Sequence, residues 1–533
     1  MKKSLEKIKY SHQVLKDARR IGLETQKSYL FLDIFLTIFV EAVAFVNSVF
    51  LIKYVLDGIQ NGVEFWNCIP ILCVIIVINL ASIIARTVRD HILRTEHLLK
   101  LAKKISYDFF QKTGRLSYYE QFNSNSKDII HFMYKNAAMI IYNSELLIST
   151  YVGYAVIFLF NFVATVYYGG CVGFLFLVIF LIIALIMQKN GIKINEIDFK
   201  HFLIQNGLNR KFRYYKDNIF FSKQMNQVFK VDEAFDFFFN KYEELIDEQT
   251  RNRMEQNRET FWLKILKNHF FDFLYHIVYF ASFSYKLIIA NSMTVGSFWA
   301  CYRACFSVFR SNIFDFFSKM HHAVQYIEQY NAFFKMPEEN SAADRKLDYK
   351  EDFEIKFDHV SFSYPGQRKR VLKDINISIK KGTNIVVLGE NGAGKSTIIL
   401  LLFRLLKPTE GKVTLNGIDI EEYDLREYRN FFNIMFQDFK IYPYSLGANV
   451  SLKNEYEAER SKIYDCLDKA GLKRVNDVMN RGIDTPLTKL FDENGYVPSG
   501  GEIGKIGFAQ QLMNEMGIYV FDEYDSSIDP LSE

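Results

Sequence analysis

Six apolar segments, each near the length of a membrane-spanning helix, constrain this chain more than any other feature. A helix needs about 20 consecutive apolar residues to cross the hydrocarbon core of a bilayer. The segments run from Ser28 to Ile52, Trp66 to Ala85, Leu146 to Tyr167, Cys171 to Met187, Phe270 to Ile289 and Val295 to Phe317. All of them lie in the first three-fifths of the 533 residues. The sequence therefore predicts a helical membrane domain at 28–317, followed by a soluble part.

The connections between these segments predict the orientation of the domain. Those after the first, third and fifth segments are short and poor in lysine and arginine, whereas those after the second and fourth are long and basic. Excess basic residues stay in the cytoplasm, so both termini are expected there. The long connections have a helical pattern and no dense apolar core, which disfavours separate soluble domains. Their tips, near 116–129 and 209–222, are expected to hold short transverse helices.

Residues 1–27 are rich in lysine and arginine and carry apolar side chains at helical spacing. This pattern predicts an amphipathic cytoplasmic helix on an anionic membrane surface, and a frayed, solvated tail is the alternative. Inside the sixth segment, Arg303 and Arg310 are seven residues apart and share a helix face, which predicts a basic cavity wall for an anionic substrate. The alternative is that Lys286 and Arg310 reach the membrane surface and that Asp272 pairs internally.

Composition excludes some functions. The formal net charge is only +4, and no basic patch is interleaved with aromatic residues, so nucleic acid is not an expected partner. The six cysteines lie mostly in apolar runs and show no zinc-binding spacing. Cys301 and Cys305, four residues apart on one predicted helix, are typical of core packing.

A soluble α/β domain is predicted from residue 351, after a charged linker at 318–350. Strand patterns at 353–357, 371–379 and 384–388 are separated by turn residues.

A phosphate loop lies in this domain, where Val386 to Ile398 reads VVLGENGAGKSTI and fits the GxxxxGK[ST] pattern between a strand and a helix. Glycines let backbone N–H groups close around phosphates, and the helix N-terminus adds partial positive charge. Lys395 is expected to reach the β and γ oxygens of a nucleotide, and Ser396 to bind Mg²⁺.

An acidic motif follows further along the chain. Ile518 to Phe521 has the pattern of a buried strand and ends in Asp522 and Glu523. These positions fit a carboxylate that orients Mg²⁺ and a carboxylate that activates water. Two acids at an ordinary strand end are the alternative, which the phosphate loop makes less favoured. A phosphate loop also occurs in kinases, GTPases and helicases, so further motifs must decide.

With these motifs the chain resembles the ATP-binding cassette (ABC) transporters, specifically the exporter-type half-transporters that fuse six spanning helices to one nucleotide-binding domain. The stretch FSYPG at 362–366 looks like the A-loop of this family, in which Tyr364 stacks on adenine. FQDF at 436–439 resembles the Q-loop, in which Gln437 senses Mg²⁺ and the γ-phosphate. The resemblance covers essentially the whole chain.

Two more motifs carry the resemblance. PSGGE at 498–502 is similar to the family signature LSGGQ, and SSID at 526–529 resembles the D-loop. In this family two nucleotide-binding domains dimerise head to tail, and each ATP lies between the phosphate loop of one subunit and the signature of the other. The resemblance therefore implies a second half-transporter subunit, identical or related.

The chain also departs from the family pattern. Pro498 and Glu502 replace the usual Leu and Gln of the signature, and Gln510 stands where an Arg is common. Glu502 is expected to bring negative charge near the γ-phosphate side of the partner site and to slow it. Because the sequence stops at Glu533, the switch histidine and the closing strands and helices are missing, and the domain at 351–533 is expected to be C-terminally incomplete.

The predicted fold is a multidomain membrane protein, with a six-helix α-helical transmembrane domain followed by an α/β P-loop NTPase (ABC-type) domain. The predicted function is ATP hydrolysis coupled to movement of a solute, such as a peptide, drug or lipid, outward across the cytoplasmic membrane. Import or lipid flipping by the same architecture is one alternative, and a hydrolysis-poor regulatory or partner subunit of a heterodimeric transporter is another.

The resemblance implies ATP and Mg²⁺ as cofactors, and a second subunit, the solute and membrane lipid as partners. Its implied catalytic residues are Glu523 and Gln437, and its implied magnesium ligands are Ser396, Gln437 and Asp522. The residues implied to bind nucleotide are Tyr364, Gly389, Asn391, Gly392, Gly394, Lys395, Ser396, Thr397, Ser499, Gly500, Gly501 and Asp529.

Overall fold

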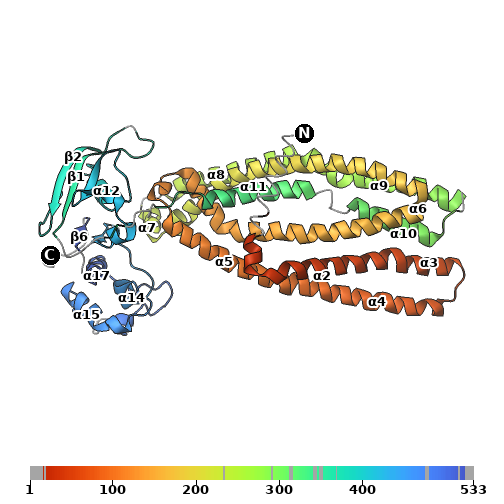
Figure 1. Cartoon of the computed structure of the whole chain (residues 1–533), viewed down its shortest axis with the longest axis horizontal. Coiled ribbons are helices and arrows are strands. Elements are labelled where there is room, and N and C mark those ends of the chain that lie inside the picture. The colour runs from red at the N-terminus through yellow and green to blue at the C-terminus, as the bar shows by residue number, and fades with distance from the viewer. Residues whose placement is uncertain are drawn as a thin grey trace. The chain divides into compact units, whose positions relative to one another are not determined.

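The chain separates into two compact units (Figure 1). The computed structural model describes residues 16, 20–231, 234–289, 292–310, 316–339, 345–346, 352–367, 369–437, 439–473, 479–513 and 517–522. Unit 1 comprises Met1–Leu116 and Asn123–Pro337, and unit 2 comprises Ser117–Phe122 and Glu338–Glu533.

The regular elements described in unit 1 are all helices. Its helices are α2 (Lys27–Phe45), α3 (Ile52–Gln60), α4 (Phe65–Thr87), α5 (Arg94–Arg115), α6 (Ser124–Tyr214), α7 (Lys223–Val231), α8 (Phe235–Ile265), α9 (Phe271–Ser284), α10 (Val295–Arg310) and α11 (Phe316–Phe334). Short π-helical segments join several of them: η1 (Val46–Leu51), η2 (Val88–Leu93), η4 (Tyr215–Phe220), η5 (Leu266–Phe270) and η6 (Tyr285–Ile289).

Three helical stretches among the described residues are long and apolar enough to cross a membrane: Lys27–Gln60, Ile69–Arg115 and Asn125–Phe220. They hold the first four predicted segments, because α6 joins the third and fourth across a kink at Gly170, whose φ is 59°. A glycine reaches this backbone conformation at little cost. Helices α9 and α10 lie within the fifth and sixth predicted segments. The prediction of a helical, membrane-type domain is confirmed.

The linker predicted at 318–350 is wrong over its first half, because α11 continues as a helix to Phe334. Val324, Ile327 and Phe333 are buried in one apolar cluster with residues of α5 and α6. Apolar residues three positions apart are a helix signal, which the surrounding charged residues obscured in the sequence.

The predicted tips of the long connections differ from each other. Near the first, η3 (Tyr118–Gln121) is a short 3₁₀ helix, as expected, and it belongs to unit 2. At the second, α6 and η4 continue to Phe220, and the next short helix, α7, begins only at Lys223. The amphipathic helix predicted at 1–27 lies mostly outside the described residues, although residues 20–25 are helical.

Unit 2 contains two sheets. The larger is antiparallel with strand order β2-β1-β3-β4, and the smaller pairs β5 and β6 in parallel. The strands are β1 (Glu354–Phe362), β2 (Leu372–Lys380), β3 (Glu410–Leu415), β4 (Ile418–Asp419), β5 (Phe432–Met435) and β6 (Ile518–Phe521). The helices are α12 (Lys395–Leu402), α13 (Leu425–Arg429), α14 (Leu446–Ser451), α15 (Arg460–Lys469) and α17 (Gly500–Leu512), with 3₁₀ turns η8 (Ile420–Glu422), η9 (Glu457–Glu459) and η10 (Gly482–Asp484).

Two apolar cores divide unit 2 into halves. The first joins β1, β3 and α12 through residues such as Phe357, Val413 and Leu401. The second joins α14, α15 and α17 through residues such as Leu446 and Ile506. The phosphate loop therefore belongs to the half with the antiparallel sheet, and the signature belongs to the helical half.

The strand predicted at 384–388 is not formed. Val386 and Leu388 are 77% and 87% exposed, and the segment has no regular secondary structure. A β-branched run becomes a strand only where a neighbouring strand supplies backbone hydrogen bonds. Among the described strands, β5 and β6 pair with each other and none pairs with this segment.

Candidate nucleotide-binding site

The phosphate loop has the backbone geometry that its glycines predict. Gly392 and Gly394 have φ angles of 81° and 98°, which other residues rarely adopt. Gly394 is also the N-cap of α12, and a Cβ atom built on it would lie 2.7 Å from Leu372 Cδ2. The loop therefore turns directly into the N-terminus of a helix, where backbone N–H groups and the helix dipole favour an anion.

Lys395 holds its ammonium over this loop. Its Nζ donates hydrogen bonds to the carbonyl oxygens of Gly389 at 2.8 Å and Glu390 at 3.3 Å. Phosphate oxygens would be stronger acceptors than these carbonyls, because both partners would be charged. The side chain is thus placed to exchange backbone acceptors for a bound phosphate.

A cavity of about 530 Å³ lies at the loop. It is lined by Tyr364, Gln367, Val371, Asn391, Gly392, Gly394, Lys395, Ser396, Thr397 and Gln437. All of these except Gln367 and Val371 are predicted nucleotide or metal ligands. The sequence analysis did not predict Gln367 and Val371 as site residues. They lie between the A-loop motif and β2, and this position is the only sequence signal for them. The volume falls in the range of small-molecule sites, about 300 to 1,000 Å³.

Tyr364 stands at the rim of this cavity. Its hydroxyl is 3.2 Å from Thr397 Oγ1 in the first turn of α12. Its ring contacts Phe362 at 5.0 Å between centroids and Phe122 at 5.7 Å. An aromatic ring at the mouth of a phosphate site is suited to stack on a nucleobase.

The segment Ser117–Phe122, which the sequence places at a tip of the helical domain, is part of unit 2. Tyr118 and Tyr119 pack against the first core of this unit. Phe122 supplies the ring contact to Tyr364. This short element, between α5 and α6 along the chain, therefore places a ring beside one of the residues that line the cavity.

The parallel pair of β5 and β6 brings two predicted ligands to one sheet edge. Met435 pairs with Phe521, and the backbone N–H of Asp522 donates to the Met435 carbonyl oxygen at 3.0 Å. Gln437 therefore leaves β5 where Asp522 leaves β6. Gln437 lines the cavity with Ser396, whereas Asp522 is not among its described lining residues. The hydroxyl, amide and carboxylate oxygens of this set are the ligand types that Mg²⁺ prefers.

Two predicted sites cannot be placed. Glu523, the predicted general base, and Asp529 of the D-loop lie outside the described residues.

The signature begins α17 and is not part of the described lining of the cavity. Ser499 is the N-cap, and it forms a capping box with Glu502. Ser499 and Gly500 are exposed, and neither they nor Gly501 are among the described residues that line the cavity. An exposed helix N-terminus with two glycines is free to meet a phosphate of another molecule.

The Glu502 carboxylate is turned back onto the start of its own helix. Its Oε2 accepts hydrogen bonds from the Ser499 backbone N–H at 2.7 Å and from Ser499 Oγ at 2.8 Å, and its Oε1 accepts one from Tyr496 OH at 2.7 Å. Burial alone would raise the pKa of Glu502, but these hydrogen bonds outweigh it and lower the pKa below its usual value. The charge is thus balanced locally, and a slowing effect on a partner site stays a prediction.

Comparisons with known proteins agree with this geometry. Residues 372–526 match the ABC transporter family. The chain is 28% identical over 315 residues to the subtilin transport ATP-binding protein SpaT of Bacillus subtilis, which covers 56% of this chain and 48% of that protein. It is 35% identical over 181 residues to the mitochondrial iron-sulfur clusters transporter ATM1 of Candida glabrata. The matched region covers 34% of this chain and 24% of that protein.

A third relative is the ATP-dependent lipid A-core flippase of Sodalis glossinidius, 33% identical over 180 residues, or 34% of this chain and 30% of that protein. The matches thus span about half or less of the length of these curated relatives. A solved structure of a bacterial Atm1-family ABC exporter with ATP bound superposes with a TM-score of 0.77 at 17% identity, covering 95% of this chain and 87% of that one. Residues 372–526 thus belong to the ABC transporter family, and the chain has the fold of an ABC exporter.

Proposed function

We propose that this protein is an ATP-driven exporter that couples ATP hydrolysis to movement of a solute across a membrane. The observation that carries the proposal is the cavity at the phosphate loop, which joins Tyr364, Lys395 and Gln437 from three separate motifs. The same chain holds three helices of membrane-spanning length among its described residues. A nucleotide site joined to a membrane-type helical domain supports transport over a soluble kinase or GTPase.

Each residue of the cavity would have its own role in binding ATP and Mg²⁺. Tyr364 would stack on the base, and Lys395 with the start of α12 would hold the phosphates. Ser396, Gln437 and Asp522 supply the oxygen atoms for Mg²⁺, which would neutralise charge on the phosphates. Glu523 would accept the proton of the attacking water.

The exposed signature supports a dimer as the working unit. Ser499, Gly500 and Gly501 lie on the half of unit 2 that does not form the cavity. In a head-to-tail pair, each signature would close the cavity of the other subunit, so that a single chain holds half of two sites. The partner is a second copy or a related half-transporter.

Location and substrate class complete the proposal. The basic connections after the second and fourth segments favour a cell membrane protein with both termini in the cytoplasm. The names of the three relatives mention subtilin, iron-sulfur clusters and lipid A-core. These names favour transport as the function, but each mentions a different substrate. They favour an active transporter over a hydrolysis-poor partner subunit.

The test is vanadate-sensitive ATP turnover by the full chain in lipid nanodiscs. We expect Mg²⁺-dependent turnover that Lys395→Ala lowers by at least about a hundredfold, because a charged group that holds the reacting phosphate is lost. Lys473→Ala is the matched control, since Lys473 is exposed and lies outside the cavity. Tight ATP binding without turnover in the unaltered chain would instead assign it the role of a hydrolysis-poor partner.

A further inference from the structure

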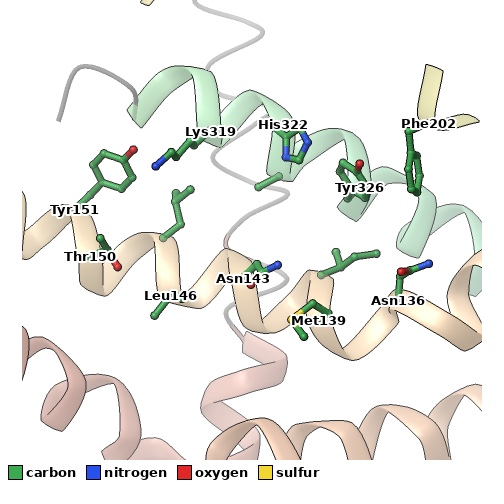
Figure 2. Close-up of a pocket in the computed structure, with 13 residues that line it drawn as sticks. Asn136, Met139, Asn143, Leu146, Thr150, Tyr151, Phe202, Lys319, His322 and Tyr326 are labelled. Atoms are coloured by element: carbon green, nitrogen blue, oxygen red, sulfur yellow. The ribbon is translucent and has the colours of Figure 1, made fainter. Parts of the chain in front are cut away.

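A second cavity lies in unit 1, between α6 and α11 (Figure 2), and none of its described lining residues belongs to a nucleotide motif. Its volume is about 610 Å³. It is a partly open groove and not an enclosed void, so a ligand can enter it without unfolding the helices. Elsewhere the same two helices pack closely, since Val324 and Ile327 of α11 share an apolar cluster with Met133 and Ala137 of α6. The cavity is therefore a local feature of this helix pair.

The position of the cavity favours an amphipathic ligand, which has a polar part and an apolar part. Apart from Phe202, its residues on α6 run from Asn136 to Tyr151, a stretch that crosses the start of the third apolar segment at Leu146. Its residues on α11 begin at Lys319, two positions after the end of the sixth segment. In a membrane, both stretches lie at the boundary between hydrocarbon and water, where amphipathic groups are the most stable.

One end of the cavity is basic. Lys319 Nζ lies 5.9 Å from the ring centroid of Tyr151, and Figure 2 shows the two side chains beside each other. None of the described residues that line the cavity is acidic, and no ion pair joins Lys319 to a described carboxylate. A cation that is held beside an aromatic ring and has no carboxylate partner is available to an anionic ligand.

Further polar groups line the same cavity as this cation. The side chains of Asn143, Thr150 and His322 line the cavity and form no hydrogen bond with protein atoms in the part of the chain that the structure describes. Burial lowers the pKa of His322, so its imidazole is neutral at pH 7 and can donate or accept a hydrogen bond. These groups can hold the remaining oxygens of a carboxylate, phosphate or sulfonate.

The other end of the cavity is aromatic and apolar. Phe202 and Tyr326 lie 5.0 Å apart between ring centroids, and Figure 2 places Phe202 at the end away from Lys319. Met139 and Asn136 line the α6 side toward this end, as Figure 2 shows. Successive residues of the set Lys319, His322 and Tyr326 are three and four positions apart. Helix α11 therefore presents a positive charge, a polar group and an aromatic ring in this order along one face.

We propose that this cavity binds an amphipathic organic anion, with its charged group on Lys319 and its apolar part against Phe202 and Tyr326. The assignment of this anion as the transported substrate rests on the proposed function. The binding itself does not, because it requires no nucleotide.

The experiment measures binding to the full chain in phosphatidylcholine nanodiscs without ATP. The probes are dodecanoate carrying an alkyl diazirine and its uncharged methyl ester, and mass spectrometry locates the cross-linked peptides. We expect the acid to label the peptides that contain residues 136–151 and 319–326. Lys319→Gln should lower this labelling about tenfold, the effect of losing one charge-assisted contact, whereas Lys319→Arg should retain it.

Two controls test whether the effect is specific to Lys319 and whether the variant is folded. Lys335→Gln removes an exposed lysine just after α11 that does not line the cavity, and it should leave labelling unchanged. Ester labelling should be equal in the unaltered and Lys319→Gln chains, which shows that the variant is folded. Equal acid labelling of both chains, or labelling confined to other peptides, would overturn the proposal.

Competition separates the possible sources of the anion. Displacement by octanoate indicates a free organic anion, and displacement by phosphatidylglycerol in the nanodisc indicates an anionic lipid headgroup. Displacement by neither contradicts the proposal. Acid binding at this cavity in a chain without vanadate-sensitive turnover would refute the proposed function and leave the binding site standing.

Discussion

Glu502 offers the sharpest test of how the signature is built. Its carboxylate accepts hydrogen bonds from Tyr496 OH and from the backbone N–H and Oγ of Ser499, at 2.7 to 2.8 Å. A helix cap contributes about 0.5 to 2 kcal/mol and a carboxylate in the first turn about 0.3 to 1 kcal/mol. These terms overlap, so we expect Glu502→Ala to lower the free energy of opening the start of α17 by about 2 kcal/mol.

Hydrogen exchange of the peptide at 500–512 in the full chain measures this directly. A loss of about 2 kcal/mol corresponds to exchange about 30 times faster. Because the folded pKa of Glu502 lies below its usual value of 4.5, its stabilisation is present above that value and is lost as the pH falls through the folded pKa. Glu493→Gln, at an exposed turn, should change neither quantity.

The variant Glu502→Gln distinguishes the effect of the helix cap from the effect of the negative charge. Glutamine keeps an acceptor oxygen and restores the residue usual in the family signature, so we expect ATP turnover within about twofold of the unaltered chain, since charge at an exposed helix start contributes little. An increase of several-fold would mean that the Glu502 charge slows the partner site, as the sequence alone suggested. Unchanged exchange in Glu502→Ala would refute the capping argument.

Two further predictions follow from close contacts. Arg94→Met should destabilise unit 1 by about 3 to 5 kcal/mol, because it leaves the fully buried Asp33, 2.7 Å from Arg94 Nε, without its cation. Asp33→Asn should cost about 1 to 3 kcal/mol, because Arg94 keeps Asp90 at 2.9 Å; thermal midpoints at one fixed heating rate test the order, and equal losses would contradict it. Gly394→Ala should weaken ATP binding more than Gly392→Ala, because both have positive φ but only at Gly394 would the new Cβ meet another side chain, at 2.7 Å. Equal dissociation constants would show that the contact is relieved without cost.

The sequence by itself determined the parts of this protein that depend on contiguous residues. The apolar segments identified the membrane-type helices, because length and hydrophobicity are local properties. The phosphate loop was equally local, since its glycines and Lys395 follow one another in the chain. The A-loop, Q-loop and signature added specificity by their order, and Tyr364, Gln437 and Lys395 line one cavity.

Only the tertiary structure decided features that depend on distant partners. The run at 384–388 has strand composition, but it stays exposed because no described strand offers it hydrogen bonds. Phe122 reaches Tyr364 only because Ser117–Phe122, which lies between α5 and α6 along the chain, packs as part of unit 2. The amphipathic cavity exists because Lys319 and Tyr151, separated along the chain, come together between two helices. Pairing and packing between distant segments are set by the whole fold, and no local pattern encodes them.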